Sequence, residues 1–421
     1  MATIALSVAD TCAAAKRASR VLATLDSGTK NAALEAIAAA LVSRTGEILE
    51  ANARDLEGAE ATGLPAHLVD RLALDAGRVA AIAAGVRDIA ALEDPVGEVI
   101  GGSRLANGLD VRKVRVPLGV IAVVYEARPN VTIDAAALCL KSGNAIVLRG
   151  SSTAASSNAA LAGIAIEASE SAGLPTGALA LVAGGGHQEL SELATQTGVV
   201  DLIIPRGGEG LKAALKDVAT VPIIYAASGN CHVYVDATAD LDAAEAIILN
   251  AKVQKPSVCN AAETLLVHAD VAPAFLPRAL SVLADAGVTL RGDERARAAA
   301  GLAPIGEATD ADWDTEFLAL ELAVGVVDSV QAAIDHINAH GSGHSEAIVT
   351  RDTEAARAFQ LGVDAACVYV NASTRFTDGG EYGMGAEIGN STQKLHARGP
   401  IGMRELCTYK YLVEGADQIR P

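Results

Sequence analysis

Cys259 is the side chain in this sequence that is best placed to act as a nucleophile. It lies in Lys255-Pro-Ser-Val-Cys259-Asn260, after a helical pattern that Pro256 helps to end and before a β-rich run. This position predicts a loop at the edge of a sheet. Lys252 and Lys255 are nearby cations that would favour the thiolate, which is the reactive form. Most free cysteines are inert packing residues, so position alone leaves both interpretations open.

The other five cysteines fall within helical or strand patterns and are predicted to be small buried hydrophobic residues. The sequence has no CxxC pair and no disulfide-framework spacing, so six free thiols in a reducing compartment are expected. These five residues are Cys12, Cys139, Cys231, Cys367 and Cys407.

Three histidines recur every four residues, at His336, His340 and His344, and superficially resemble a metal-binding helix face. Gly341 is predicted to end that helix before His344, and Ile337 stands where an HExxH motif has its glutamate. No metal is therefore expected. We predict instead that His336 and His340 complement the negative end of a helix.

Glycine-rich turns are the usual signal for a nucleotide, and no GxGxxG follows a predicted strand here. The run from Gly383 to Gly389 has the wrong spacing. Gly184-Gly-Gly186 and Gly207-Gly208 do follow predicted strands, so they either let the backbone approach a phosphate or a flat ring or simply form turns. No GxSxG, Walker or protein-kinase pattern occurs, which argues against the commonest hydrolases and phosphotransferases.

Composition indicates a folded globular protein. The 421 residues are 51% hydrophobic and 20% charged, a length that predicts two or three domains. Acidic residues outnumber basic ones by 51 to 33, and the resulting charge of −18 repels nucleic acids and anionic membranes. No run of 18 uncharged apolar residues occurs, and the first 20 residues lack the pattern of a signal peptide, so a cytoplasmic location is expected.

The elements that must position these residues follow from periodicity. Residues 1 to about 95 are predicted to be helical. An Asn107-Gly108 pair between two extended runs predicts a β-hairpin with a type I′ turn. Strand and helix patterns then alternate from Val120 to about Val235 and again after Asp240, which predicts two α/β domains with parallel sheets. A ligand site is expected in the cleft between two such domains.

Five segments resemble the glutamate-5-semialdehyde dehydrogenase family, also called gamma-glutamyl phosphate reductases, within the aldehyde dehydrogenase superfamily. The resemblance extends over nearly all of the chain, in order. The segments are Pro117-Leu-Gly-Val-Ile-Ala-Val-Val-Tyr-Glu-Ala-Arg-Pro129-Asn130, Lys255-Pro-Ser-Val-Cys259-Asn260, His336-Ile-Asn-Ala-His340-Gly-Ser-Gly-His344-Ser345-Glu346-Ala-Ile348, Val370-Asn371-Ala-Ser-Thr-Arg375-Phe376-Thr-Asp-Gly379 and His396-Ala-Arg-Gly-Pro400.

This resemblance implies an α/β fold of the aldehyde-dehydrogenase type, with two doubly wound parallel-sheet domains and a small β arm for oligomerisation. Residues 1–100 and 117–236 would form the nucleotide-binding domain, and residues 237–370 the catalytic domain. Residues 101–116 and 397–421 would form the arm, and residues 371–396 a segment returning to the nucleotide-binding domain. A homo-oligomer is expected.

The resemblance also implies that the protein reduces L-glutamyl 5-phosphate to L-glutamate 5-semialdehyde with NADPH and releases phosphate, which is the second step of proline biosynthesis. Cys259 would displace phosphate, because a thioester accepts hydride more readily than a carboxylate. The backbone N–H of Cys259 and the amide of Asn130 would hold the oxyanion, although a turn-forming role for Asn130 fits equally well. Functional coupling to glutamate 5-kinase is expected.

Two departures from the wider superfamily argue for reduction with NADPH. Oxidising members use a glutamate to activate water, and Ala226 occupies the matching position, so water is left unactivated. NAD-preferring members carry a glutamate where this chain has Ser152. The Arg149 guanidinium with the Ser151 and Ser152 hydroxyls suits a 2′-phosphate, or these are ordinary polar residues at a strand end.

The remaining cofactor and substrate contacts come from the same comparison. Gly207 and Gly208 would lie against the cofactor, and Glu316 resembles the glutamate that binds the nicotinamide ribose, with a solvated acid as the alternative. The substrate's phosphate and α-carboxylate require cations, which the family motifs would supply. The candidates are Arg128, Lys255, His344 and Arg375, and which end of the substrate each one binds stays open.

Two other functions compete with this one. A hydrolytic aldehyde oxidiser could use the same fold, but Ala226 argues against it. A binding or scaffold protein without activity would have no need for the cysteine and histidine motifs. Phosphate-dependent turnover separates the reductase from the first alternative, and cofactor binding separates it from the second.

Overall fold

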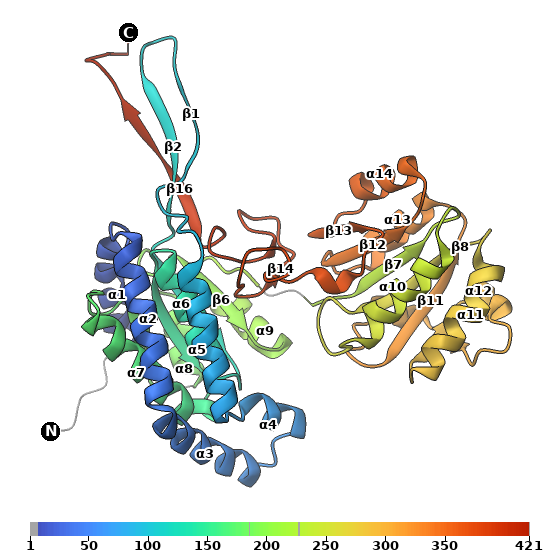
Figure 1. The fold of residues 1–421 in the computed structure, drawn as a ribbon, viewed down its shortest axis with the longest axis horizontal. Coiled ribbons are helices and arrows are strands. Elements are labelled where there is room, and N and C mark those ends of the chain that lie inside the picture. Colours follow the sequence, from blue (N-terminus) through green and yellow to red (C-terminus); the bar gives the residue numbers. More distant parts are fainter. Residues whose placement is uncertain (1–6, 185, 226–227, 421) are drawn as a thin grey trace. The chain divides into compact units, whose positions relative to one another are not determined.

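The computed structural model describes residues 7–184, 186–225 and 228–420. It divides into two compact units. Unit 1 comprises residues 1–225, 384–389 and 401–421, and unit 2 comprises residues 226–383 and 390–400. The division after residue 225 lies earlier than the predicted domain boundary at 236. Figure 1 shows the helices and strands along the chain.

Unit 1 begins with five helices, as the periodicity predicts. Side chains of Ser7, Asp26 and Asp75 accept hydrogen bonds from backbone N–H groups in the first turns of α1, α2 and α5, which explains where these helices start. Leu34 and Ile37 on α2 lie in the core. The helices are α1 (Val8–Leu22), α2 (Ser27–Ser43), α3 (Thr45–Ala61), α4 (Ala66–Leu72) and α5 (Ala76–Ala91).

The sheet of unit 1 has four parallel strands in the order β5-β4-β3-β6. Strands β3 and β4 are buried along their whole length, as expected where helices cover both faces. The strands are β3 (Val120–Tyr125), β4 (Ala145–Gly150), β5 (Leu179–Leu181) and β6 (Leu202–Arg206). The helices between and after them are α6 (Asn130–Lys141), η1 (Ser152–Ala154), α7 (Ala155–Ser171), α8 (His187–Ala194) and α9 (Glu209–Val218).

A separate antiparallel sheet contains β1 (Val99–Arg104), β2 (Asp110–Pro117) and β16 (Cys407–Glu414), in the order β1-β2-β16. The predicted hairpin and terminal strand therefore belong to one sheet. The predicted type I′ turn is wrong, because that turn needs two residues with positive φ and only Gly108, at 88°, has one in the described loop. Strand β1 is exposed throughout, and β16 is exposed after Cys407.

Unit 2 contains seven parallel strands in the order β10-β9-β11-β8-β7-β12-β13. Alternate residues of a strand enter different cores: Val233 packs with α10 and α11, whereas Tyr234 packs with α13 and α14. The strands are β7 (Cys231–Val235), β8 (Ala262–His268), β9 (Thr289–Gly292), β10 (Gly306–Glu307), β11 (Glu321–Val327), β12 (Ser345–Val349) and β13 (Cys367–Val370). The expected doubly wound architecture is confirmed.

Helices cover both faces of that sheet. They are α10 (Leu241–Val253), α11 (Ala272–Asp285), α12 (Glu294–Ala299), α13 (Val330–His340) and α14 (Thr353–Gly362), with short turns η2 (Asp310–Asp314) and η3 (Thr374–Phe376). Of the predicted return segment 371–396, residues 371–383 and 390–396 belong to unit 2, and residues 384–389 belong to unit 1. Unit 2 ends in a small antiparallel pair, β14 (Asn390–Ser391) with β15 (Gly399–Pro400). None of the described helices is long and apolar enough to cross a membrane.

Candidate active site

Cys259 lies in the turn between α10 and β8 and is partly exposed, whereas the other five cysteines are buried. Burial raises the pKa of the Cys12 thiol to about 11 and that of Cys407 to about 12. Such thiols stay protonated near neutral pH and are poor nucleophiles. The Cys259 thiol is therefore better placed to react than the thiols of the other five cysteines, which are buried.

The start of β7 packs directly against the backbone of Cys259. A Cβ atom added at Gly229 would lie 2.7 Å from the Cys259 Cα and would overlap the Cys259 carbonyl. The Cys231 thiol donates a hydrogen bond to the same carbonyl oxygen, at 3.2 Å. Only glycine fits at position 229, a requirement that the sequence analysis did not identify.

Asn260 fixes the other side of the Cys259 turn. Its side-chain amide donates to the carbonyl of Thr377 at 2.9 Å, and its Oδ1 accepts a hydrogen bond from the Arg375 guanidinium. Thr374 Oγ1 donates to the Asn260 carbonyl at 2.7 Å. The residue next to the candidate nucleophile is thus bound to the segment that carries Arg375.

Arg375 is a cation in electrostatic contact with the candidate nucleophile. Burial lowers the pKa of its guanidinium, and Cys259 acts in the opposite direction, as a negative neighbour does. Arg375 Nε also donates to Gln254 Oε1 at 2.7 Å. The structure therefore places one predicted substrate cation beside the predicted nucleophile.

Glu316 also lies in this cluster. Its Oε1 accepts a hydrogen bond from the Gly229 N–H at 2.6 Å, and Gly229 contacts Cys259. Cys259, Arg375 and Glu316 come from three distant stretches of unit 2.

The two lysines predicted to stabilise the thiolate differ in their surroundings. Lys252 is fully buried, and its Nζ lies 2.5 Å from Glu263 Oε2. Burial raises the pKa of the Glu263 carboxyl to about 7, although Lys252 opposes this shift. Lys252 is therefore paired with Glu263 inside the core, and its effect on the Cys259 thiolate stays a prediction. Lys255 is exposed in the turn.

His344 does not supply the positive charge expected of it. The side chain is 1% exposed, and burial lowers its pKa to about 4, so the imidazole is neutral near pH 7. Its Nδ1 lies 2.7 Å from Ser345 Oγ, which in turn lies 2.6 Å from Thr377 Oγ1. His344 thus supports the segment that contains Arg375.

In unit 1, the residues that follow three strands lie at one edge of the sheet. Tyr125 of β3 is aligned with Gly150 of β4 and with Arg206 of β6. Because the strands are parallel, the segments 126–130, 151–152 and 207–208 all leave from the same carboxyl edge, where nucleotides bind in open α/β sheets.

Arg149 and the two serines that follow β4 have the donors that a phosphate requires. Arg149 is nearly buried and donates to the Gly186 carbonyl at 2.7 Å; burial lowers its pKa, and Glu189 and Glu126 oppose the shift. Ser151 Oγ is buried and has no hydrogen-bond partner in the described part of the chain. Ser152 is exposed. These groups fit the phosphate of a dinucleotide.

Two glycines and a carboxylate line the neighbouring turn. The Gly208 N–H donates to Glu126 Oε2 at 2.9 Å, and a Cβ at Gly207 would lie 2.7 Å from that carboxylate. Sequence reasoning did not identify Glu126. Gly184 and Gly186 are described, whereas Gly185 lies outside the described residues.

The two remaining candidates follow β3. Arg128 is partly buried. Asn130 begins α6, and its amide donates to Asp134 Oδ2 at 2.9 Å, within the same helix. This hydrogen bond within one helix is typical of a local structural role for Asn130. Ala226, matched by resemblance to the missing base, lies outside the described residues.

Comparisons with known proteins agree with one another. A family model described as aldehyde dehydrogenase family matches residues 3–304. The gamma-glutamyl phosphate reductase of Thermobifida fusca is 54% identical over 96% of this chain and 97% of its own length. The one from Moorella thermoacetica is 53% identical over 99% of both chains.

Solved structures give the same answer. The crystal structure of gamma-glutamyl phosphate reductase from Thermotoga maritima matches with a TM-score of 0.96 and 44% identity, and covers 99% of this chain and 100% of that one. An acetylating aldehyde dehydrogenase from Geobacillus thermoglucosidasius, at 19% identity and a TM-score of 0.66, shares the fold over 98% of this chain and 97% of its own.

Proposed function

The chain belongs to the gamma-glutamyl phosphate reductases of the aldehyde dehydrogenase family, and from this premise we propose that it reduces L-glutamyl 5-phosphate with NADPH through a thioester on Cys259. The products are L-glutamate 5-semialdehyde and inorganic phosphate. The observation that carries the proposal is that Cys259 alone among the six cysteines is partly exposed, and that the Arg375 guanidinium interacts electrostatically with it.

The first step forms a bond between Cys259 Sγ and the acyl carbon of the substrate. The bond from that carbon to the phosphate oxygen breaks, and phosphate leaves with the electron pair. Arg375 supports this step in two ways: its charge favours the thiolate, and a guanidinium binds phosphate oxygens through paired N–H groups.

The developing oxyanion needs donors that are in place before the reaction. We propose the backbone N–H of Cys259 as the first donor, since the turn is held by Gly229 on one side and Asn260 on the other. Asn130 is the second candidate, and it would have to exchange its Asp134 partner for the substrate.

NADPH, when bound, supplies the hydride that reduces the thioester. In this chain Arg149, Ser151 and Ser152 would hold its 2′-phosphate, with Gly207 and Gly208 against the remainder of the cofactor. Glu316 would bind the nicotinamide ribose, and its contact with Gly229 supports a position near Cys259. After reduction, the C–S bond breaks, and the aldehyde and the Cys259 thiolate are released.

The substrate's two anionic ends require cations in a protein with a charge of −18. Arg375, Lys255 and Arg128 remain the candidates, and His344 would contribute a neutral imidazole. We further propose that the sheet of β1, β2 and β16 joins copies of the chain, because its exposed side chains include Tyr409, Tyr411 and Val413. A cytoplasmic location and coupling to glutamate 5-kinase belong to the same proposal.

The test is mass spectrometry of the protein mixed with freshly generated glutamyl phosphate, without NADPH. An acyl adduct on Cys259 is expected, and it should disappear in Cys259→Ser. The Cys259→Ser variant should also lose phosphate-dependent reduction of NADP by the semialdehyde while still binding NADPH. An adduct on another residue, or turnover by Cys259→Ser, would refute the mechanism.

A further inference from the structure

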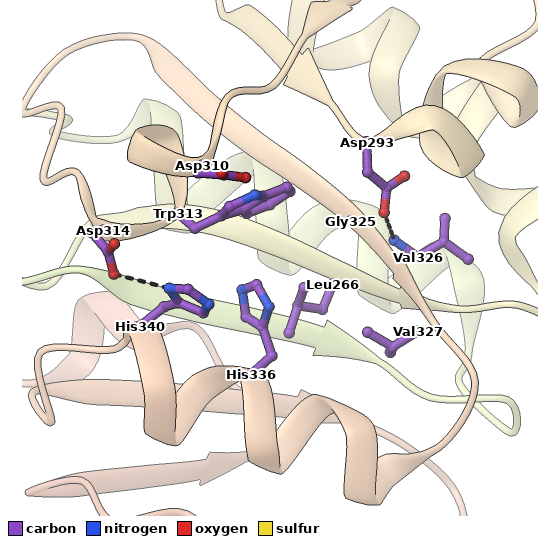
Figure 2. Close-up of a pocket in the computed structure, with 10 residues that line it drawn as sticks. All are labelled: Leu266, Asp293, Asp310, Trp313, Asp314, Gly325, Val326, Val327, His336 and His340. Atoms are coloured by element: carbon purple, nitrogen blue, oxygen red, sulfur yellow. Dashed lines mark hydrogen bonds and ion pairs between the residues drawn. The ribbon is translucent and has the colours of Figure 1, made fainter.

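Two cavities of unit 2 border helix α13, on different faces of the helix. Figure 2 shows the first, where the imidazoles of His336 and His340 lie side by side with Trp313 above them. The second has a volume of about 450 Å³ and is lined by the end of α13, the loop to β12 and the segment between β14 and β15. Small-molecule sites usually have volumes of about 300–1,000 Å³. None of the steps proposed above uses a residue that lines this second cavity.

Glu346 of β12 is a buried acid in the lining of the second cavity. Its side chain is 0% exposed, and its Oε2 accepts the His232 backbone N–H at 2.6 Å and lies 3.0 Å from His232 Nδ1. The other carboxyl oxygen, Oε1, is buried and has no hydrogen-bond partner in the described part of the chain. A buried acceptor without a donor costs free energy, so Oε1 favours a ligand that brings a donor.

Gly341 leaves Glu346 Oε1 open to the cavity. This glycine also lines the cavity, and a Cβ atom added to it would lie 3.1 Å from Glu346 Oε1. A side chain at position 341 would therefore stand in front of that oxygen. The other oxygen, Oε2, is turned towards β7 by its two contacts with His232. A ligand in the cavity would therefore meet Oε1.

The guanidinium of Arg398, which lines the same cavity, also has an unused hydrogen-bonding atom. Arg398 Nε is buried and has no partner among the residues that the structure describes. Its Nη1 donates to Asp364 Oδ1 at 3.1 Å, and its Nη2 donates to the Asp364 carbonyl at 3.2 Å. Lys394 Nζ binds the same Asp364 carboxylate. One carboxylate thus serves two cations, which leaves a positive charge and a free donor for an acceptor group of a ligand.

The charges of the lining exclude simple ions as ligands. A cation would suit Glu346 but would be repelled by Arg398 and Lys394. An anion would suit the two cations but would be repelled by the buried Glu346 carboxylate. A zwitterion satisfies both groups, because its ammonium supplies the donor and its carboxylate the acceptor.

The two unused atoms lie near glycines that are close in the chain. Gly341 is beside Glu346 Oε1, and a Cβ atom at Gly343 would lie 3.7 Å from Arg398 Nη2. The two glycines are two residues apart, so their Cα atoms are separated by at most about 7 Å. An α-amino acid carries its ammonium and its carboxylate on the same carbon and is therefore the compact zwitterion that this spacing favours.

We propose that this cavity binds a free α-amino acid, with the ammonium at Glu346 Oε1 and the carboxylate at Arg398 Nε and Lys394. Hydrogen bonds in which both groups are charged are the strong kind. The site is a second one, since neither Cys259 nor Arg375 lines the cavity. The proposal therefore does not rest on the reaction proposed for Cys259.

The test is a thermal melt of the full-length protein with each standard amino acid added alone at the same millimolar concentration, without NADPH or glutamyl phosphate. At least one amino acid is expected to raise the melting temperature. Calorimetric titration with that amino acid then gives its affinity. The matching carboxylic acid without the ammonium, and the matching amine without the carboxylate, should each bind at least tenfold more weakly, because each loses one charged hydrogen bond.

Glu346→Gln and Arg398→Gln should each weaken binding of that amino acid at least tenfold. Glu346→Gln should fold, because the glutamine carbonyl can still accept the His232 N–H, and Arg398 is partly exposed; a thermal melt of each variant checks this. Arg278→Gln is the matched control. Arg278 is an exposed arginine of unit 2 that is paired with two carboxylates of α10, and its variant should bind the amino acid like the parent protein.

Arg375→Gln separates this site from the Cys259 turn. It should bind the amino acid with the parent's affinity whether or not it retains activity, so the two proposals can fail independently. The absence of a shift with every amino acid, unchanged affinity in folded Glu346→Gln or Arg398→Gln, or lost binding in folded Arg375→Gln overturns the proposal.

Discussion

Gly229→Ala tests whether the turn of Cys259 must be held in place for the reaction. The new Cβ would lie 1.4 Å from the Cys259 carbonyl oxygen and 2.7 Å from the Cys259 Cα. Non-bonded heavy atoms in contact are about 3.5–4.0 Å apart, so either Cys259 or Gly229 must move by about 2 Å. A misplacement of about 1 Å at a reacting group already costs about a hundredfold in rate, so kcat should fall by at least about that factor.

The assay is phosphate-dependent reduction of NADP by glutamate 5-semialdehyde, together with the rate at which iodoacetamide alkylates Cys259. The overlap should also cost about 1–3 kcal/mol in the free energy of unfolding, measured by urea titration. Gly58→Ala is the matched control, since no atom lies within 4 Å of a Cβ at this exposed helical position. It should keep full activity and gain about 0.5–1 kcal/mol.

A Gly229→Ala protein with wild-type kcat and unchanged alkylation would refute the reasoning, because it would show that the turn tolerates the displacement. Loss of activity in Gly58→Ala as well would refute it too, since a general effect of glycine substitution would then explain both results.

Three further predictions concern other parts of the site. Ser151→Ala should leave the thermal stability of the apoprotein unchanged, because Ser151 Oγ has no hydrogen-bond partner in the described chain. The variant should weaken NADPH binding about tenfold in a fluorescence titration without changing NADH binding. Equal losses of affinity for both cofactors would contradict the assignment. Arg375→Gln should lower kcat/KM for glutamyl phosphate at least tenfold and slow Cys259 alkylation at pH 7, whereas wild-type values for both would exclude its role. The pKa of His344 is lowered to about 4, so between about pH 6.5 and pH 4 the unfolded chain binds a proton that the folded chain does not, and the free energy of unfolding should fall as the pH falls. His344→Gln should reduce the slope of the unfolding free energy against pH by up to about 1.4 kcal/mol per pH unit. An unchanged slope would contradict the burial argument.

Much of the architecture could be predicted because it depends on local patterns. Parallel strands that are covered on both faces need continuous apolar runs joined by helices, and such runs at Val120–Tyr125 and Ala145–Leu148 are recognisable in the sequence. The turn at Asn107-Gly108 was located correctly but typed wrongly, because several turn types place a left-handed glycine there.

The candidate site could be predicted only in part. The position of Cys259 between a proline-terminated helix and a strand indicated its exposure. The ionisation state of the residues around Cys259 could not be predicted, because Lys252 and Glu263 form an ion pair inside the core and His344 is buried. Charge and pKa depend on burial and on partners, which a linear spacing does not contain.

The sequence by itself determined the parallel α/β class, the family and the identity of the one cysteine in an accessible turn, since these depend on periodicity and on contiguous motifs. Only the tertiary structure decided what surrounds that cysteine. Gly229, Asn260 and Arg375 contact its turn because β7, β8 and η3 pack together, and Asn260 and Arg375 are 115 positions apart in the chain. Contacts across such separations are selected by the packing of whole elements, and no local pattern of residues encodes them.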